Sequence, residues 1–237
     1  MAISTNLLAW LRSVKPRRAM ALLLLLLPLT VGAQTVRDMW LSMPPSFAPY
    51  LSASLRTQCL DFYDMHADAQ TDNALKGKSR IDTLTSTFLA ATLSKAHTLQ
   101  MKLLPAAGSA SGSSLGSSSV SGSSLSSCDS VLCVVRSWDG PKRDSEVQLF
   151  DRQWKPLQAP LTFSADSFVC RPDTMSEERF SRLVALLDPI MFSVSLSPTD
   201  NVLLVKLSPV VPNPDDEKAI EQIFVQRKLK WDGKTFK

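Results

Sequence analysis

Asp173-Thr-Met-Ser176 begins the stretch that decides the fold, which runs on to Phe236. Ser176 is a typical helix N-cap, and the two glutamates that follow it suit the positive end of a helix. Beyond the helix, apolar and polar residues alternate, which is typical of a strand with one solvated face. The predicted strands are Phe192-Ser-Val-Ser-Leu-Ser-Pro198, Asp200-Asn-Val-Leu-Leu-Val205 and about Ile223 to Trp231. The stretch therefore predicts one helix followed by three antiparallel strands.

An earlier stretch has the same elements in the same order. Thr85 is its N-cap, and Leu89 and Leu93, four residues apart, mark the buried face of its helix. Its predicted strands are Leu99–Pro105, Asp129–Val134 and Glu146–Trp154. We therefore predict an α+β fold made by tandem duplication of a helix plus a three-stranded antiparallel meander (αβββ twice). The helices are expected on one side of either one sheet or two facing sheets.

An extra N-terminal helix precedes the first repeat. Residues 34–51 contain Pro44, Pro45 and Pro49 and are predicted to be an extended lead-in, because proline prevents a regular helix. A helix from about Ser52 to Met65 follows, since its apolar residues recur at helical spacing. Its apolar stripe is Leu51, Leu55, Cys59 and Phe62 or Tyr63, and its polar side carries Arg56, Gln58 and Asp61. We expect this helix to cover one face of a sheet.

A Ser/Gly-rich insert at residues 106–128 separates the first two strands of the first repeat. Such a tract has too little apolar content to pack, and lengthening a surface loop costs little closure entropy. We interpret the insert as an expanded hairpin tip and not as a domain boundary. The predicted organisation is a signal peptide at 1–33, the N-terminal helix plus first repeat at 34–157, and the second repeat at 158–237. Both repeats are expected to form one compact globular unit.

The N-terminal segment has the three parts of a secretory signal peptide. A basic region from Arg12 to Arg18 precedes an apolar run from Ala21 to Thr30, and cleavage is predicted between Ala33 and Gln34. The apolar run is shorter than the roughly 20 residues that a spanning helix needs. We therefore expect an exported protein, periplasmic or secreted or peripheral to the outer membrane, without a membrane span in the mature chain. Met20 is an alternative start to Met1, although it would remove the basic region.

The formal charge of +4 belongs to the predicted signal peptide. That segment holds four of the 26 basic residues and none of the 22 acidic ones, so 22 of each remain after cleavage. A neutral balance removes the electrostatic case for nucleic acid, which a basic surface would make. We expect an unknown protein partner in the cell envelope and no nucleic acid.

All four cysteines lie beyond the predicted cleavage site: Cys59, Cys128, Cys133 and Cys170. An even number of cysteines in an exported protein permits disulfides. Cys133 lies in an apolar run and Cys59 on an apolar helix face, so free buried thiols are the alternative. The pairing stays open, with Cys128 and Cys170 as the more exposed candidates.

A search for catalytic groups finds no constellation. Gly112-Ser-Ser-Leu-Gly116 matches the nucleophile-elbow pattern, but it lies in the Ser/Gly tract without the strand and helix that the motif requires. Neither His66 nor His97 has a flanking motif that supports a general base. An acidic cluster lacks the glycine and terminal glutamate of a calcium loop; it comprises Asp61, Asp64, His66, Asp68 and Asp72. We therefore predict no catalytic residue, no cofactor and no metal site.

Trp154 and Trp231 end the third predicted strand of each repeat. Polar residues flank both, so each is either a half-buried sheet aromatic or a displayed contact. We name these two tryptophans as candidate partner-surface aromatics.

Four stretches carry a family resemblance: Gln34-Thr-Val-Arg-Asp-Met-Trp-Leu-Ser-Met-Pro44, Arg56 to Met65, Ile81-Asp-Thr-Leu84 and Val225-Gln-Arg-Lys-Leu-Lys-Trp-Asp-Gly-Lys-Thr-Phe236. Together they resemble a family of exported Bacteroidetes proteins known as domain of unknown function 3256. The resemblance covers the chain beyond the signal peptide, except the Ser/Gly insert. It implies an envelope or secreted location and brings no activity and no functional residue.

These features predict a non-catalytic periplasmic or envelope protein that acts by protein binding or as a structural component. Unpaired sheet edges of such a fold offer surface for a partner. The alternative is an inhibitor or chaperone-like module for an exported enzyme, because the repeat plan is similar to β-lactamase-inhibitor-like and PepSY-type modules. A hydrolase that uses unidentified residues is the third hypothesis.

Overall fold

A computed structural model describes residues 34–107, 130–211 and 213–237. The predicted signal peptide, including Ala33, and most of the Ser/Gly insert, including Cys128 and Gly112–Gly116, lie outside these ranges. Two antiparallel sheets and short helices make up the described part, so the predicted α+β class is confirmed.

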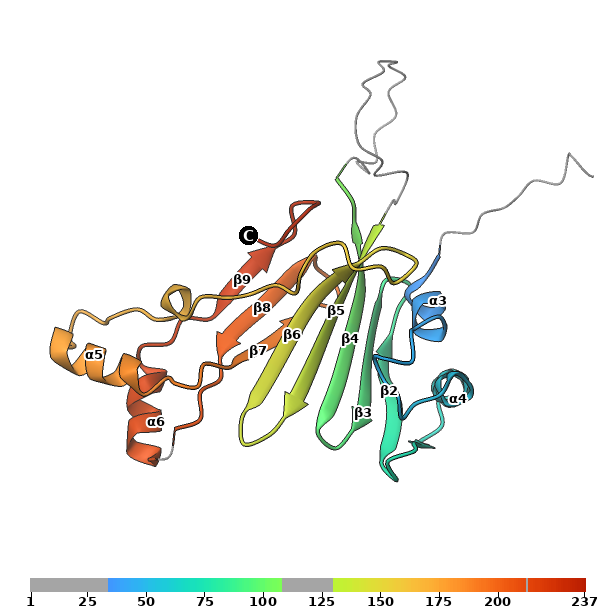
Figure 1. Cartoon of the computed structure of the whole chain (residues 1–237), viewed down its shortest axis with the longest axis horizontal. Coiled ribbons are helices and arrows are strands. Elements are labelled where there is room, and N and C mark those ends of the chain that lie inside the picture. The colour runs from blue at the N-terminus through green and yellow to red at the C-terminus, as the bar shows by residue number, and fades with distance from the viewer. Residues whose placement is uncertain (1–33, 108–129, 212) are drawn as a thin grey trace, which may run out of the picture. The chain divides into compact units, whose positions relative to one another are not determined.

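The larger sheet has six strands in the order in which they occur along the chain; Figure 1 shows β2 to β6 side by side. The strands are β1 (Thr71–Asp72), β2 (Lys78–Leu84), β3 (Phe88–Ser94), β4 (His97–Pro105), β5 (Ser130–Asp139) and β6 (Arg143–Phe150). The strands β4 and β5 flank the insert and pair along their whole length, from His97 opposite Trp138 to Pro105 opposite Ser130.

The smaller sheet has the order β7-β8-β9. Its strands are β7 (Phe192–Leu196), β8 (Val202–Leu207) and β9 (Arg227–Lys230), and a short 3-10 turn, η1 (Ala165–Phe168), precedes them. Helix α5 (Glu177–Ala185) begins at the predicted N-cap Ser176, whose hydroxyl accepts from the N–H of Arg179. Helix α6 (Pro214–Glu221) lies between β8 and β9 and begins at Asn213.

The six-stranded sheet is covered on both faces, and each face belongs to a separate core. Helices α3 (Val36–Leu41) and α4 (Ala53–Asp64) cover one face together with the loop between them. That core includes Met39, Trp40, Leu89, Leu93, Leu99, Met101, Leu132 and Val134. The smaller sheet and helices α5 and α6 build the second core. Its members include Phe88, Leu104, Val135, Leu149, Val194, Leu196, Leu203 and Val205.

The predicted first repeat helix is wrong, because the residues around Leu89 and Leu93 form strand β3. A spacing of four residues places two side chains on one face of a helix, and it does the same in a strand, whose period is two. Ala91 lies between them and is buried on the same face, which completes a strand pattern. The tandem αβββ duplication is therefore not confirmed: the second copy has its predicted first helix and first two strands, but the unpredicted helix α6 precedes its third strand, which begins at Arg227 instead of about Ile223.

The predicted extended lead-in is also wrong over its first part, where α3 forms. Thr35 and Asp38 make a capping box: the Thr35 hydroxyl accepts from the Asp38 N–H, and the Asp38 carboxylate accepts from the Thr35 N–H at 2.7 Å. The first proline of this segment, Pro44, comes after the helix has ended.

Helix α4 begins at Ser52 and packs on the sheet as predicted, but Arg56 is not on its polar side. Arg56 is 4% exposed, and its guanidinium donates to the carbonyls of Leu51 and Leu41 at 3.1 and 3.2 Å. The long side chain thereby satisfies the carbonyl of Leu41, which the C-terminal end of α3 leaves free, and the carbonyl of Leu51 in the loop before α4.

Polar side chains on β4 and β6 hold the two sheets together. Strand β7 lies at an edge of the smaller sheet and contacts β4, β5 and β6. The N–H of Val194 donates to the Ser145 hydroxyl at 3.1 Å, and the N–H of Leu196 donates to the Gln100 side-chain oxygen at 2.8 Å. These amides point away from β8, so the larger sheet supplies the hydrogen bonds that a further strand would supply.

Lys102 fixes the hairpin turn that follows β7. Its side chain is 2% exposed, and its ammonium donates to the carbonyls of Ser197, Pro198 and Asp200 at 2.6, 3.2 and 2.7 Å. Burial lowers the pKa of Lys102, and the charge of Asp200 opposes that effect. The smaller sheet therefore covers the face of β4 that carries Gln100 and Lys102.

We expect Lys102→Met to lower the free energy of unfolding by about 2 kcal/mol, because three carbonyl oxygens lose a charged donor. Urea unfolding of the purified protein measures this difference. Lys228→Met, at an exposed lysine of β9, is the matched control and should change stability little. Equal effects of the two substitutions would contradict the role assigned to Lys102.

Candidate functional site

The two candidate aromatics, Trp154 and Trp231, lie in different cores and are not brought together. Trp154 is 7% exposed, packs its ring on Phe47 and Phe150, and donates from Nε1 to the Ser42 hydroxyl. It follows the end of β6 instead of lying in the strand, with a positive φ of 63°. Its ring offers no partner surface in this structure.

Trp231 is half-buried just after β9. Its ring packs on Phe236, and its Nε1 donates to the Pro105 carbonyl at 2.7 Å. The N–H and one ring face are thus engaged within the chain, so Trp231 acts mainly as a link between the end of β4 and the C-terminal turn.

The two histidines have unlike surroundings. His97 is 8% exposed at the start of β4, where its Nδ1 and the Tyr50 hydroxyl are 2.5 Å apart. Its ring stacks on Trp138 with a centroid distance of 5.3 Å, and Nε2 has no partner among the described residues. Burial lowers the pKa of His97, and the nearby charge of Arg136 lowers it further. Among the described residues, the Tyr50 hydroxyl is the one hydrogen-bond partner of this imidazole, which otherwise packs on Trp138.

The cysteines of the described residues form no disulfide with one another. Cys59 and Cys133 are buried and Cys170 is exposed. Complete burial raises the pKa of the Cys133 thiol, with the Lys102 charge acting in the opposite direction. A thiol of this kind is unreactive at neutral pH.

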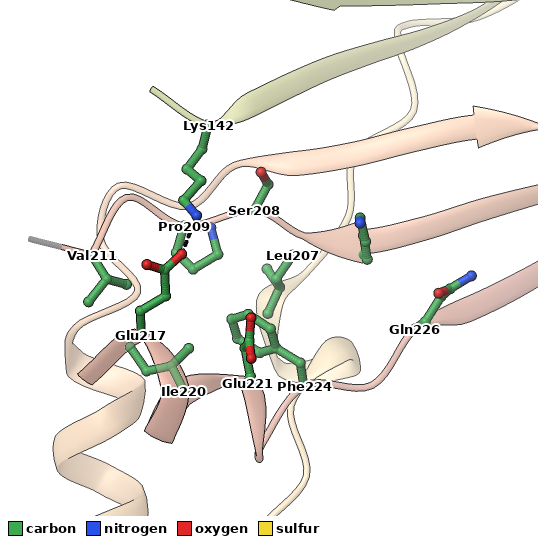
Figure 2. A pocket seen from close by; sticks show the side chains of 11 residues that line it. Lys142, Leu207, Ser208, Pro209, Val211, Glu217, Ile220, Glu221, Phe224 and Gln226 are labelled. Atoms are coloured by element: carbon green, nitrogen blue, oxygen red, sulfur yellow. Dashed lines mark hydrogen bonds and ion pairs between the residues drawn. The ribbon is translucent and has the colours of Figure 1, made fainter. Parts of the chain in front are cut away.

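One cavity of about 430 Å³ lies between α6 and the end of β8, shown in Figure 2. Leu207, Ile220 and Phe224 form its apolar floor. Lys142, from the β5–β6 hairpin, forms an ion pair with Glu217 of α6 at the rim. This ion pair joins the β5–β6 hairpin to α6.

The outer edges of the two sheets differ in whether another segment of the chain pairs with them. The segment 156–161 covers the outer edge of β6, where the N–H groups of Leu157 and Leu161 donate to the carbonyls of Leu149 and Val147. The segment around Val169 pairs with Phe224 just before β9, and Lys230 exchanges backbone hydrogen bonds with Lys237. Neighbouring segments therefore lie beside the edge of β6 and beside both ends of β9.

The edge formed by β2 pairs with another strand over only two residues. Strand β1 pairs only with Lys78 and Ser79, so no strand of the described residues lies beside the outer side of Arg80–Leu84. Helix α4 runs next to this edge, as Figure 1 shows. Unpaired edges with exposed backbone groups are the usual sites at which another chain adds a strand.

Two hollows lie between α4 and this edge, and together we name them the β2 groove. The first, of about 460 Å³, is lined by Cys59, Phe62, Tyr63, His66, Ala67, Asp68, Ala69, Arg80, Ile81 and Asp82. The second, of about 390 Å³, is lined by Thr35, Arg37, Tyr63, Asp64, Leu84, Thr85 and Ser86. Tyr63 belongs to both hollows and separates them.

The hydroxyl of Tyr63 occupies the edge at Leu84. It accepts from the N–H of Leu84 at 3.1 Å and donates to its carbonyl at 3.4 Å. These are the two groups that would pair with a neighbouring strand, so the phenol takes the place of a strand backbone at this one residue.

Carboxylates predominate around the groove. Arg37 makes a bidentate ion pair with Asp64, and Arg80 pairs with Asp82. The hydrogen bond to Asp64 raises the pKa of Arg37, and the charges of Asp64, Asp38 and Asp61 raise it further. No ion pair of the described residues engages Asp61 or Asp68. The groove and its surroundings therefore carry excess negative charge.

The residues of the acidic cluster seen in the sequence thus make separate contacts in the structure. Asp64 binds Arg37, Asp72 binds Lys78, and Asp68 lines the groove beside His66. No group of three or more potential metal ligands converges in the part of the chain that the structure describes. Sequence reasoning missed the groove, because Tyr63 and Leu84 are brought together only by folding; the family-like stretches that contain them were the one available signal.

We expect the stability of the protein to fall as the pH is lowered through the ordinary histidine range, about pH 6.5. The unfolded chain binds a proton on His97 at a higher pH than the folded chain does, so the unfolded state gains. Urea unfolding at about pH 8 and about pH 5 should show a smaller change for His97→Gln than for the wild type. His66→Asn, at an exposed histidine with positive φ, is the control, and it should retain the wild-type change.

The comparisons with known proteins concern family and fold. The family model described as "Protein of unknown function (DUF3256)" matches residues 28–114 and 117–236. A solved structure, of a domain of an uncharacterized protein from Porphyromonas gingivalis W83, is similar with a TM-score of 0.62 and 23% identity. The match covers 86% of this chain and 99% of that one, and at this identity it shows the fold alone. No curated protein matches the chain.

Proposed function

Because the chain belongs to the family described as protein of unknown function DUF3256, we propose its role from its geometry. The proposed role is that of an exported, non-catalytic protein of the periplasm or cell envelope that acts by binding a protein partner. The family resemblance and the match to a Porphyromonas gingivalis structure agree with a Bacteroidetes setting.

The observation that carries this proposal is the open edge of β2. The fold closes the outer edges of β6 and β9 with its own segments and the edge of β7 with side chains of the larger sheet. An edge left open among closed ones is a surface for another polypeptide, since main-chain hydrogen bonds there supply affinity.

Export is supported by the N-terminal sequence pattern that ends at Ala33. In residues 34–107, 130–211 and 213–237, no helix is long and apolar enough to cross a membrane. The proposed location is the periplasm, the exterior or the periphery of the outer membrane.

Affinity purification after chemical crosslinking in the native host, with cell fractions kept separate, tests this role. We expect a stoichiometric protein partner in an envelope fraction. Recovery of the protein alone from every fraction would contradict the proposal. The partner also decides between two forms of binding: an exported enzyme whose activity falls on binding would indicate the inhibitor or chaperone-like role, and a non-enzyme would indicate a structural one.

A further inference from the structure

We propose that the β2 groove binds an extended segment of the partner that carries lysine or arginine side chains, laid beside β2 as an added strand. This inference rests on the proposed function, because it names the class of partner that the open edge accepts. Three features of the groove support it: the length of free edge, the position of Tyr63, and the charge.

The free edge has room for a short strand. Strand β1 occupies the line beside β2 for two residues, Thr71 and Asp72, and then ends. Residues Arg80–Leu84 continue that line without a further strand among the described residues, and helix α4 lies beside them with the Tyr63 hydroxyl on Leu84. A segment of about five residues would therefore extend the sheet where β1 stops.

The Tyr63 hydroxyl shows that the edge accepts hydrogen bonds from the side of α4. It pairs with both backbone groups of Leu84, as a strand would. An added strand that reaches Leu84 must displace this hydroxyl. Removing the hydroxyl therefore frees the edge, and binding along β2 should become stronger.

The walls of the groove define the side chains that fit. Phe62, Tyr63 and the buried Ile81 give an apolar surface at the first hollow, and Asp68 lies at its side with no ion-pair partner in the described ranges. Alternate side chains of a strand point to opposite sides. A segment in which β-branched apolar residues alternate with basic ones meets both the apolar wall and the carboxylates.

A second copy of this chain fits the groove less well. Each copy would bring the same excess of carboxylates to the contact, and like charges placed opposite one another destabilise a strand pair. The strand also carries a bulge at Asp82, which has no partner residue on β3. Bulges of this kind hinder the long, regular pairing of two identical edges.

The test uses two fluorescent heptapeptides of equal length, one alternating valine with lysine and the other valine with glutamate. Fluorescence anisotropy with the purified protein should show saturable binding of the lysine peptide and much weaker binding of the glutamate peptide. Added salt should weaken binding of the lysine peptide, because the charges of the groove are exposed to solvent and are screened by salt.

Two substitutions separate edge binding from general attraction. Asp68→Asn should lower the affinity for the lysine peptide by about threefold, as expected for the loss of one exposed ion pair. Tyr63→Phe should raise the affinity for the lysine peptide by about fivefold, since two backbone groups of Leu84 become free. Asp173→Asn, at an exposed aspartate far along the chain, is the matched control and should leave the affinity unchanged.

Absence of lysine-peptide binding to both the wild type and Tyr63→Phe would overturn the inference, as would equal affinity for the two peptides. A concentration-dependent dimer that Tyr63→Phe strengthens would replace the partner segment with a second copy. Binding of the lysine peptide that appears only after residues 1–33 are removed would indicate that the occupant of the groove is the chain's own N-terminal segment and not a partner segment.

A photo-crosslinking amino acid at position 80 in the native host separates this inference from the proposed function. Crosslinking of the partner from position 80 and not from position 173 supports the β2 groove. A partner recovered by affinity but never crosslinked from position 80 overturns the groove and leaves the binding role intact. Recovery of no partner by either route overturns the binding role itself.

Discussion

The ammonium group of Lys102 is the contact on which the arrangement of the two sheets depends. It is buried on the face of β4 and binds three carbonyl oxygens of the turn between β7 and β8. A buried ammonium is costly unless each of its three protons has an acceptor, and this turn supplies one for each. The contact therefore favours one position of the β7–β8 hairpin on the larger sheet over other positions. Gln100 and Ser145 add to it by binding the outward amides of β7.

The packing of the smaller sheet on the larger one also decides which strand edges lie against other parts of the chain. Strand β7 would have an open edge in an isolated three-stranded sheet, but it lies against polar side chains of the larger sheet. The edges of β6 and β9 are closed by neighbouring segments of the chain. Strand β2 keeps a stretch that no strand of the described residues pairs with; helix α4 lies beside it, and the Tyr63 hydroxyl bonds one residue of it. The proposed binding role follows from this difference between edges.

The sequence predicted the elements whose signals are local. Ser176 with its two glutamates predicted α5, and the alternation after Phe192 and the turn at Pro198–Asp200 predicted the β7–β8 hairpin. The helix at Ser52 was predicted from its apolar spacing. Strand β3 was not, because Leu89 and Leu93 satisfy the spacing of a helix and of a strand equally. The capping box at Thr35 was a local signal that was overlooked.

The remaining differences come from contacts between distant parts of the chain. On β4, the polar residues Gln100 and Lys102 bind backbone groups about a hundred residues away in the sequence. Arg56 was placed on the polar side of α4, yet it binds the carbonyls of Leu51 and Leu41. The β2 groove depends on the packing of α4 against the edge, which no spacing in the sequence reveals.

Amide hydrogen exchange on the purified protein tests the central claim, that the larger sheet closes the β7 edge and leaves the β2 edge open. The account predicts strong protection of the Val194 and Leu196 amides, although neither is bonded to a strand at that edge. It predicts fast exchange for the amides of Arg80–Thr83 that point away from β3. Fast exchange at Val194 and Leu196, together with protection along β2 equal to that of β4 and β5, would contradict it.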